Sequence, residues 1–313
     1  MGKKNLPISY VRNSSTIIDP MYSILDYLNI IPFNQDIFSG VSSLVFRFSV
    51  NRKLDFPSTF IYNWNENWLA TDFIGIYSKM YSSYTDDFTF PLYQKKLLHA
   101  IIKNINDDIP SIIWRDEFVV VKGYDDEKKV LIYTDGEAEH LLSYPELGYS
   151  SLPMWCIHLF SKDKIILDEK ELYLESIFQA VYKARSHDPS LSEEHYACGL
   201  KVYDFINDAL KDRLTLDEST IRTLKTFSAL KHQLSNYFHA IKWKMPELAA
   251  TLDQLDNLSD VFSTIKEQLY SGKPASLIPL FTQAKKFETN FFQSLEETYQ
   301  VEFHNRMGSI WLR

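Results

Sequence analysis

Residues 117–136 read EFVVVKGYDDEKKVLIYTDG, and this stretch decides the fold of the first half of the chain. The run Phe118–Val121 and the run Val130–Tyr133 are rich in β-branched and aromatic residues, which is typical of strands. Glycine, aspartate and lysine fill the interval between them, and this is the composition of a turn. The stretch therefore predicts a β-hairpin with a longer loop.

Shorter apolar patterns predict further elements on the N-terminal side of the hairpin and just after it. Short apolar or alternating runs are typical of strands, and a 3.6-residue spacing of apolar residues is typical of helices. Strands are predicted at 44–50, 60–62, 111–114 and 154–160, and helices at 72–81 and 93–104.

An earlier helix is predicted from the stretch SSTIIDPMYSILDYLN at 14–29, whose apolar residues follow the helical period. Thr16 and Asp19 have the spacing of a capping box, and Pro20 fits only in the first turn of a helix. A buried helix is therefore expected to start near Ser15 or Thr16, with these hydroxyl groups at its N-terminus.

After Lys164 helical periodicity dominates to the end of the sequence. The boundary between two domains is therefore placed near residue 165. The sequence predicts an α+β protein with an α/β domain over 1–165 and an all-helical domain over 166–313. Within the second domain, helices are predicted near 168–185, 192–212, 217–243, 246–271 and 275–302.

The composition argues against several classes of function. The 313 residues carry a net charge of −8, and basic residues occur in runs of two or three, so nucleic-acid binding is not expected. Glycine is scarce, with 9 residues, and neither GxGxxG nor GxxxxGK[ST] occurs. No nucleotide-binding loop, and no cofactor, is expected.

The cysteine content favours a reducing compartment. Cys156 and Cys198 are too few for a disulfide framework, and no CxxC motif occurs, so a cytoplasmic location is expected. The N-terminus MGKKNLPISY lacks a signal-peptide apolar run, and no segment approaches about 18 uninterrupted apolar residues. No membrane association is expected.

The hairpin resembles the segment HxVVVxGYDDxxxxxxxxDP of papain-like proteins of the bacteriocin-processing (double-glycine) peptidase type. It looks closest to the butirosin-biosynthesis acyltransferase family. The stretch DPMYSILDYLN at 19–29, followed by FSGVSSLVFRF at 38–48, is similar to the start of that family. YACGLKVYDFINDALKD at 196–212 resembles a helix of its C-terminal part. The resemblance touches most of the chain and implies a papain-like domain followed by helices.

The resemblance also implies a catalytic site. In the family, a cysteine nucleophile starts the first helix, a histidine on the first hairpin strand is the base, and an acid on the next strand orients the histidine. Here the nucleophile position falls on Ser14, Ser15 or Thr16. Glu117 stands at the base position, and Asp135 retains the orienting acid. Cysteine-protease activity is therefore not expected.

Two interpretations of these positions stay open. In the first, Ser14 or Thr16 is a hydroxyl nucleophile and Glu117 is its base. Asp135 would then supply the like charge that makes Glu117 basic enough. In the second, Thr16 is a helix cap, Glu117 is a surface residue of a strand, and no chemistry takes place.

Other groups are candidate binding sites. Cys156 and His158 share one face of a strand, where packing is the simpler interpretation. The acidic residues around the hairpin suit a cationic ligand, but they lack the spacing of a calcium loop, so no metal site is expected. These acidic residues are Asp116, Glu117, Asp125, Asp126 and Glu127.

The aromatic segment FIYNWNENWLATDF at 60–73 gives a candidate substrate-binding surface. Trp64 and Trp68 are interleaved with asparagine and glutamate, a mixture that suits a small-molecule surface. The same mixture suits the edge of a core. Both interpretations stay open for these two tryptophans.

Taken together, these features predict an acyltransferase-like protein of specialised (natural-product) metabolism with a Ser/Thr–Glu–Asp site. The alternative is a catalytically inactive papain-like relative, a pseudoenzyme that binds a ligand or partner in the same cleft. A small molecule or an acyl-carrier protein is the expected partner. The scarcity of glycine, together with exposed phenylalanine, is compatible with a homodimer.

Overall fold

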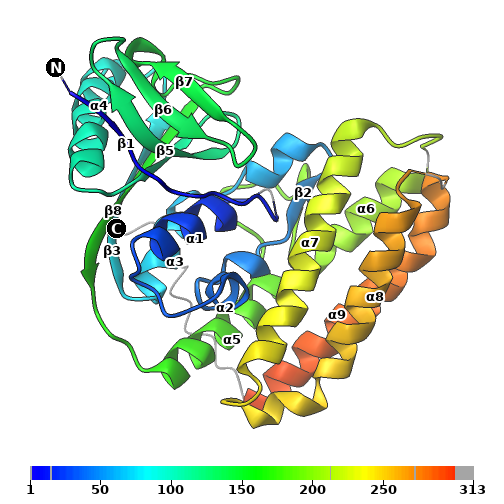
Figure 1. Cartoon of the computed structure of the whole chain (residues 1–313). Coiled ribbons are helices and arrows are strands. Elements are labelled where there is room, and N and C mark those ends of the chain that lie inside the picture. The colour runs from blue at the N-terminus through cyan, green and yellow to red at the C-terminus, as the bar shows by residue number, and fades with distance from the viewer. Residues whose placement is uncertain (1, 15, 212, 271–272, 300–313) are drawn as a thin grey trace. The chain divides into compact units, whose positions relative to one another are not determined.

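The computed structural model describes residues 2–14, 16–211, 213–270 and 273–299 (Figure 1). Helices and an antiparallel sheet confirm the α+β class. Contacts divide the chain into two units. We call Met1–Gln35 with Asn67–Ile166 the sheet unit, and Asp36–Glu66 with Leu167–Arg313 the helical unit. Residues 36–66, which the sequence placed in the first domain, thus make their contacts with the helices.

The sheet unit is built on one antiparallel sheet, and the predicted hairpin supplies two of its adjacent inner strands. The short strand β1 (Lys3–Asn5) also pairs with the hairpin, alongside the last residues of β5. Across the sheet the order is β3 (Ile76–Tyr84), β8 (Met154–Lys164), β4 (Ser111–Trp114), β5 (Phe118–Asp125), β6 (Val130–Thr134) and β7 (Glu139–Ser143).

Gly123 is required by the close approach of β1. A Cβ atom on Gly123 would lie 2.6 Å from the carbonyl oxygen of Lys4, closer than real Cβ atoms come to backbone. The β5–β6 register also shifts between Val121 and Gly123. The presence of glycine in the GYDD motif therefore has a structural reason, because only a residue without a side chain lets β1 pair with β5 at this position.

Helix α4 (Phe90–Asn106) covers one face of the sheet. Its buried Leu97, Ile101 and Ile105 belong to the same core cluster as residues of β4, β5 and β8. Successive residues of a strand point to opposite faces, so the alternate residues of these strands form the other face. Helix α1 (Ile18–Tyr27) contacts β4 and β5.

A buried polar network ties helix α3 (Asn65–Phe73) to this sheet. His158 on β8 is 1% exposed, and its Nε2 lies 2.8 Å from Ser78 Oγ on β3. Ser78 Oγ lies 2.6 Å from the hydroxyl of Thr71 on α3. The imidazole of His158 also stacks on Phe160 at 4.4 Å between centroids. The histidine is therefore enclosed by protein groups on this part of the sheet.

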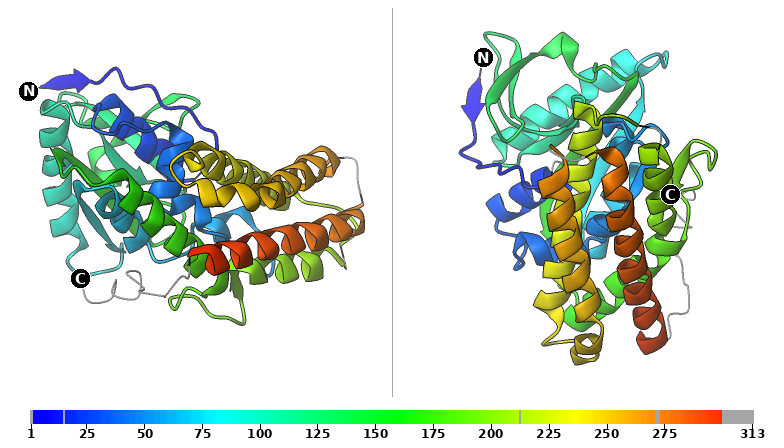
Figure 2. Two further views of the ribbon diagram at one scale, coloured as in Figure 1. Left: turned by 90° about the horizontal axis from the view of Figure 1, so that it is seen from below. Right: turned by 90° about the vertical axis from the view of Figure 1, so that its right-hand side faces the viewer.

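The helical unit contains long helices and a two-stranded sheet. Strands β2 (Ser49–Asn51) and β9 (Tyr196–Cys198) pair antiparallel. Helices α7, α8 and α9 lie side by side, as their contacts and both views of Figure 2 agree. The helices are α2 (Gln35–Val41, of which Gln35 belongs to the sheet unit), α5 (Glu169–Arg185), α6 (Val202–Lys211), α7 (Glu218–Ile241), α8 (Leu252–Gln268) and α9 (Ile278–Tyr299).

A buried ion pair joins α7 to α9 within the helical unit. Lys231 Nζ lies 2.6 Å from Glu288 Oε1, and both side chains are at most 5% exposed. Tyr203 donates its hydroxyl to the same carboxylate. The ammonium group of Lys231 lies 3.8 Å from the ring centroid of Phe48. Residues 36–66 are thus held against the helices by buried charge and by aromatic packing.

Several predicted elements were wrong. The stretch 44–50 begins with a 3-10 helix at Leu44–Phe46, and only its last two residues belong to a strand, β2. The stretch 60–62 starts on the last residue of another 3-10 helix, Phe56–Phe60. Most of 72–81 is strand β3, in which buried and exposed residues alternate at the start. The predicted helix at 192–212 contains strand β9 before α6, so the second half is not all-helical. The other predicted strands and helices are present, although their ends differ from the predicted ends by up to six residues. Residues 212, 271 and 300–302 of the predicted helices lie outside the described residues.

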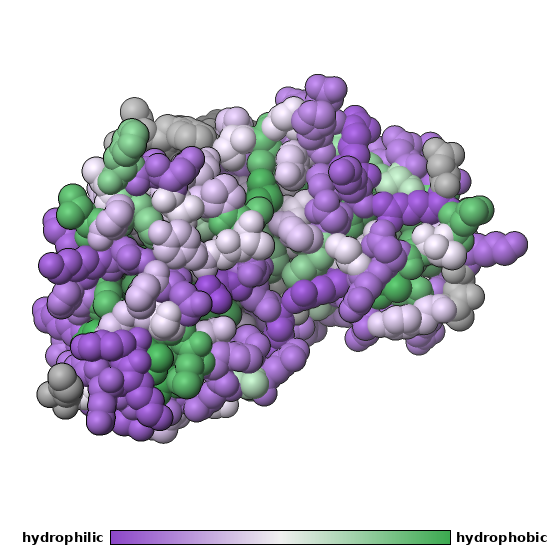
Figure 3. Space-filling model, turned by 90° about the horizontal axis from the view of Figure 1, so that it is seen from above, coloured by the Kyte–Doolittle hydropathy of each residue, from purple (hydrophilic) through white to green (hydrophobic). Residues whose placement is uncertain are grey.

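Apolar side chains also reach the surface. Phe88, Ile166 and Leu214 are each at least 90% exposed. On the face drawn in Figure 3, apolar side chains form separate patches among polar ones. A homodimer stays a prediction. Within the described ranges, no helix is both long enough and apolar enough to cross a membrane.

Candidate functional site

The candidate nucleophiles precede α1 rather than cap it. The helix begins at Ile18, and its N-cap residue, Ile17, makes no side-chain cap. The predicted capping box is therefore wrong, although Pro20 lies in the first turn as expected. Ser15 lies outside the described residues. Ser14 and Thr16 remain as the hydroxyl groups whose surroundings can be described.

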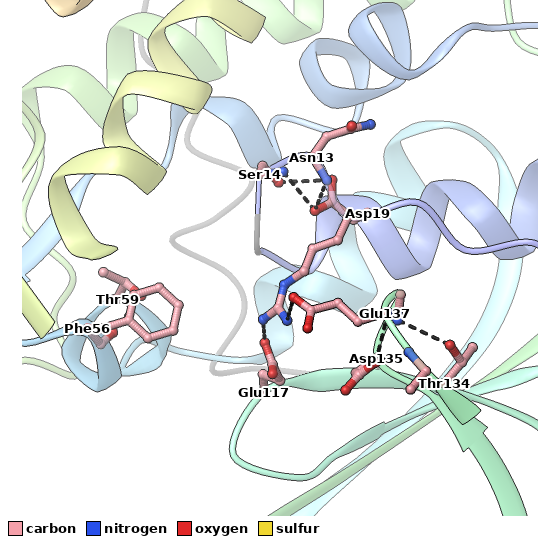
Figure 4. A network of polar contacts seen from close by, with 12 residues as sticks. Asn13, Ser14, Asp19, Phe56, Thr59, Glu117, Thr134, Asp135 and Glu137 are labelled. Atoms are coloured by element: carbon pink, nitrogen blue, oxygen red, sulfur yellow. Dashed lines mark hydrogen bonds and ion pairs between the residues drawn. The ribbon is translucent and has the colours of Figure 1, made fainter. Parts of the chain in front are cut away.

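Asp19, in the first turn of α1, accepts hydrogen bonds from the residues before the helix through its carboxylate (Figure 4). Its Oδ2 accepts the backbone N–H groups of Asn13 at 3.0 Å and Ser14 at 2.8 Å. Its Oδ1 accepts the Ser14 hydroxyl at 3.0 Å and the Gln35 side-chain amide at 2.8 Å. Asp19 is 0% exposed, so these donors replace water around the carboxylate.

The two hydroxyl groups form a short chain that ends at this carboxylate. Ser14 Oγ lies 2.7 Å from Thr16 Oγ1. Because Ser14 donates its one hydrogen to Asp19, Thr16 donates to Ser14. Thr16 Oγ1 also accepts the N–H of Ile18 at 3.3 Å. Ser14 is buried and Thr16 is half-buried, so Thr16 is the hydroxyl nearer to solvent.

Glu117, the residue at the base position, is ion-paired with Arg12. The second guanidinium nitrogen of Arg12 lies 3.6 Å from a carboxylate oxygen of Glu137. The side chain of Arg12 is 14% exposed and that of Glu117 is 25% exposed, so water screens this pair only in part. A guanidinium group that is ion-paired with a carboxylate favours the charged, weakly basic form of that carboxylate.

Asp135 holds its own turn together with a histidine. Its Oδ1 accepts the N–H groups of Glu137 and Ala138, each at 2.9 Å. Its Oδ2 lies 2.8 Å from Nε2 of His140 on β7, whose ring stacks on Tyr133. Partial burial would raise the pKa of Asp135, but these donors outweigh burial and lower the pKa. The carboxylate is therefore held charged.

The acidic residues around the hairpin do not form one cluster. Asp116 and Glu117 precede β5, whereas Asp125 ends it, which separates them by roughly 26 Å at about 3.3 Å per residue. Asp125 accepts the turn N–H groups of 127 and 128, and Asp126 accepts the N–H of Gly2. Among the described residues, no group of three or more His, Cys, Asp or Glu side chains is placed to hold a metal ion.

The two tryptophans have structural partners within their own units. Trp64 is 4% exposed, and its indole N–H donates to the carbonyl of Phe60 at 2.9 Å. The indole N–H of Trp68 donates to the carbonyl of Ser78 on β3 at 3.3 Å. Trp64 belongs to the helical unit and Trp68 to the sheet unit. Their substrate-binding role stays a prediction.

Sequence reasoning missed three residues of this site: Arg12, Asp19 and His140. Arg12 contacts carboxylates that lie more than a hundred residues later in the sequence, and a local sequence pattern cannot predict such a contact. Asp19 was interpreted as part of a capping box. His140 could have been found, because a tight turn after Asp135 brings the start of the next strand back beside it.

Comparison of the chain with protein-family models finds no match, and comparison with curated proteins finds no significant match. The resemblance to the butirosin-biosynthesis family therefore stays a prediction that rests on the quoted motifs.

Proposed function

We propose that this chain is a catalytically silent, papain-like relative of the butirosin-biosynthesis acyltransferases, which binds a ligand at the start of α1 instead of transforming it. The observation that carries the proposal is the ion pair between Arg12 and Glu117. The carboxylate at the base position faces a guanidinium group. The guanidinium stabilises the charged form of this carboxylate, which makes it a poor base toward a hydroxyl group.

The hydroxyl groups at the nucleophile position support the same proposal. Ser14 is 1% exposed and already donates to Asp19. Asp19 accepts several other hydrogen bonds, and each of these stabilises its charged form and makes it a poorer base. Neither Glu117, which pairs with Arg12, nor Asp19, which the hydroxyl of Ser14 contacts, is therefore suited to remove a proton from these hydroxyl groups.

The charges around this segment favour a ligand that carries an amino group. Asp19, Glu117, Asp135 and Glu137 are acidic, whereas Arg12 supplies one permanent positive charge. A small organic amine would complement this excess of negative charge. An acyl-carrier protein as partner, and specialised metabolism as the setting, stay predictions.

Acyl transfer is the second candidate, because Thr16 is half-buried and its hydroxyl group is linked through Ser14 to Asp19. In that case Thr16 attacks the acyl carbonyl, its proton passes to Ser14, and the proton of Ser14 passes to Asp19. The thiol of the donor then leaves, and an amine takes the acyl group from Thr16.

Thiol release from an acetyl thioester of N-acetylcysteamine, in the presence of a small primary amine, separates the two candidates. The proposal predicts that the wild type and Thr16→Ala both release thiol at the rate of buffer alone. Release that is fast in the wild type and absent in Thr16→Ala, with equal melting temperatures, would establish acyl transfer instead.

Calorimetry at low salt with spermidine as the probe tests binding. The proposal predicts saturable binding that weakens several-fold in Glu137→Gln, because the variant removes one of the negative charges that attract the ligand. Glu137 is mostly exposed, so the substitution should leave the fold intact. Asp26→Asn, at an exposed position near the C-terminal end of α1, is the matched control and should bind like the wild type. Equal binding by all three proteins would remove the assignment of the ligand to this site.

A further inference from the structure

We infer that the residues before α1, together with Gln35, form a binding site for a small carboxylate, and that the chain fills this site with its own Asp19. The site consists of the Asn13 and Ser14 backbone N–H groups, the Ser14 hydroxyl and the Gln35 side-chain amide. We call these four donors the carboxylate cradle. The inference goes beyond the proposed function and does not depend on whether the site is catalytic.

The geometry of the carboxylate cradle matches a carboxylate group in the arrangement of its donors. Two donors reach each oxygen of Asp19, at distances between 2.8 and 3.0 Å. Two successive backbone N–H groups that point to one oxygen form a concave anion site of the kind found in many proteins. These amides belong to Asn13 and Ser14, so the site is distinct from the N-terminus of α1 itself.

The donors are held in place by groups other than Asp19. The side-chain amide of Asn13 donates to Gln35 Oε1 at 2.6 Å. This bond fixes the Gln35 amide with its N–H group toward the cradle. The Ser14 hydroxyl is linked to Thr16, which in turn accepts the N–H of Ile18 at the start of α1. The cradle is therefore expected to persist when its occupant is removed.

Burial limits the ligand to a small planar anion. Asp19 is 0% exposed, and its side chain beyond Cα is the size of acetate. Burial, together with the nearby charge of Asp19, raises the pKa of Tyr10 and keeps that neighbour neutral. Formate and acetate have the size, the shape and the two oxygens that the four donors require, whereas chloride has neither the shape nor the second acceptor atom.

The experiment is chemical rescue of Asp19→Ala, read as the melting temperature of the full chain. Asp19→Ala should melt below the wild type. Formate or acetate should raise its melting temperature in proportion to the logarithm of the ligand concentration, with an apparent Kd on the order of millimolar. Sodium chloride at equal ionic strength should give no such rise.

Two matched variants make the result specific. Asp19→Asn keeps the side chain in the cradle but presents an amide to donors, so it should be destabilised and should not respond to acetate. Asp26→Ala, at an exposed position on the same helix, should behave like the wild type. If Asp19→Ala does not fold in chloride, its refolding yield is compared between acetate and chloride, and a higher yield in acetate supports the inference.

Equal responses of Asp19→Ala to acetate and chloride would overturn the inference, because they would show that the donors disperse when Asp19 is gone. The same melting response to acetate in Asp19→Asn would also overturn it, because that effect could not come from the vacated cradle.

Discussion

Acidification should destabilise the sheet unit through His158, well before most carboxylates are protonated. The imidazole is 1% exposed, lies against Phe160, and shares a hydrogen bond with Ser78. Burial lowers the pKa of His158 from 6.5 to about 3. The native state therefore holds the neutral ring at a pH at which the unfolded chain already binds a proton.

The sign and size of the effect follow from this difference. Between the folded and unfolded pKa values the unfolded chain binds more protons, so stability is complete above pH 6.5 and is lost as the pH falls toward 3. One pKa unit corresponds to about 1.4 kcal/mol, so a fall to about pH 4 removes about 3 kcal/mol of unfolding free energy.

Urea unfolding at about pH 7 and about pH 4 measures this loss, with His158→Gln as the control. Glutamine can keep a hydrogen bond to Ser78 but does not titrate, so the variant should lose about 3 kcal/mol less than the wild type over this interval. Burial also lowers the pKa of His232, but that histidine is common to both proteins and cancels in the comparison. The reasoning is refuted if the two proteins lose the same stability.

Three further substitutions test the packing, each by urea unfolding. Gly123→Ala should lower the free energy of unfolding by about 1–3 kcal/mol, because its Cβ would collide with the backbone of β1. An unchanged urea midpoint would contradict the β1–β5 pairing. Lys231→Ala should cost about 3–5 kcal/mol, because Glu288 would be left buried without its cation. A loss under about 1 kcal/mol would mean that this pair is hydrated. Gly40→Ala should lower the free energy of unfolding by about 1–3 kcal/mol, because its Cβ would lie 2.3 Å from the ring of Tyr237. An unchanged free energy of unfolding would mean that α2 does not pack against Tyr237.

The parts of the fold that the sequence predicted are those with strong local periodicity. The hairpin and the long helices α4, α5 and α7 carry their own pattern. By contrast, β1 has three residues and pairs with β5 about 120 positions later, so no local pattern marks it. Strand β3 was predicted as helix because buried and exposed residues alternate only at its start, so the two-residue period of a strand is weak over its length.

The position of the candidate site stays a prediction from the motif, and the motif does not indicate which residues its side chains contact. The segment before α1 and the ends of the hairpin strands were identified from the family motif. What each side chain meets there depends on long-range contacts: Glu117 meets Arg12, and Asp19 meets Gln35. The motif residues Asp125 and Asp126 turned out to hold the hairpin turn and the N-terminus. The motif therefore only proposes a position for the site, and the contacts of the side chains at that position depend on residues outside the motif.

The most direct test of the central proposal is the intact mass of the protein after incubation with an acetyl thioester and no amine acceptor. Without an acceptor, any acyl-enzyme formed on Ser14 or Thr16 should accumulate. A silent site with Glu117 paired to Arg12 predicts an unchanged mass. A gain of one acetyl group, located on the peptide that contains Thr16 and absent from Thr16→Ala, would contradict the proposal and show that the hydroxyl group is a working nucleophile.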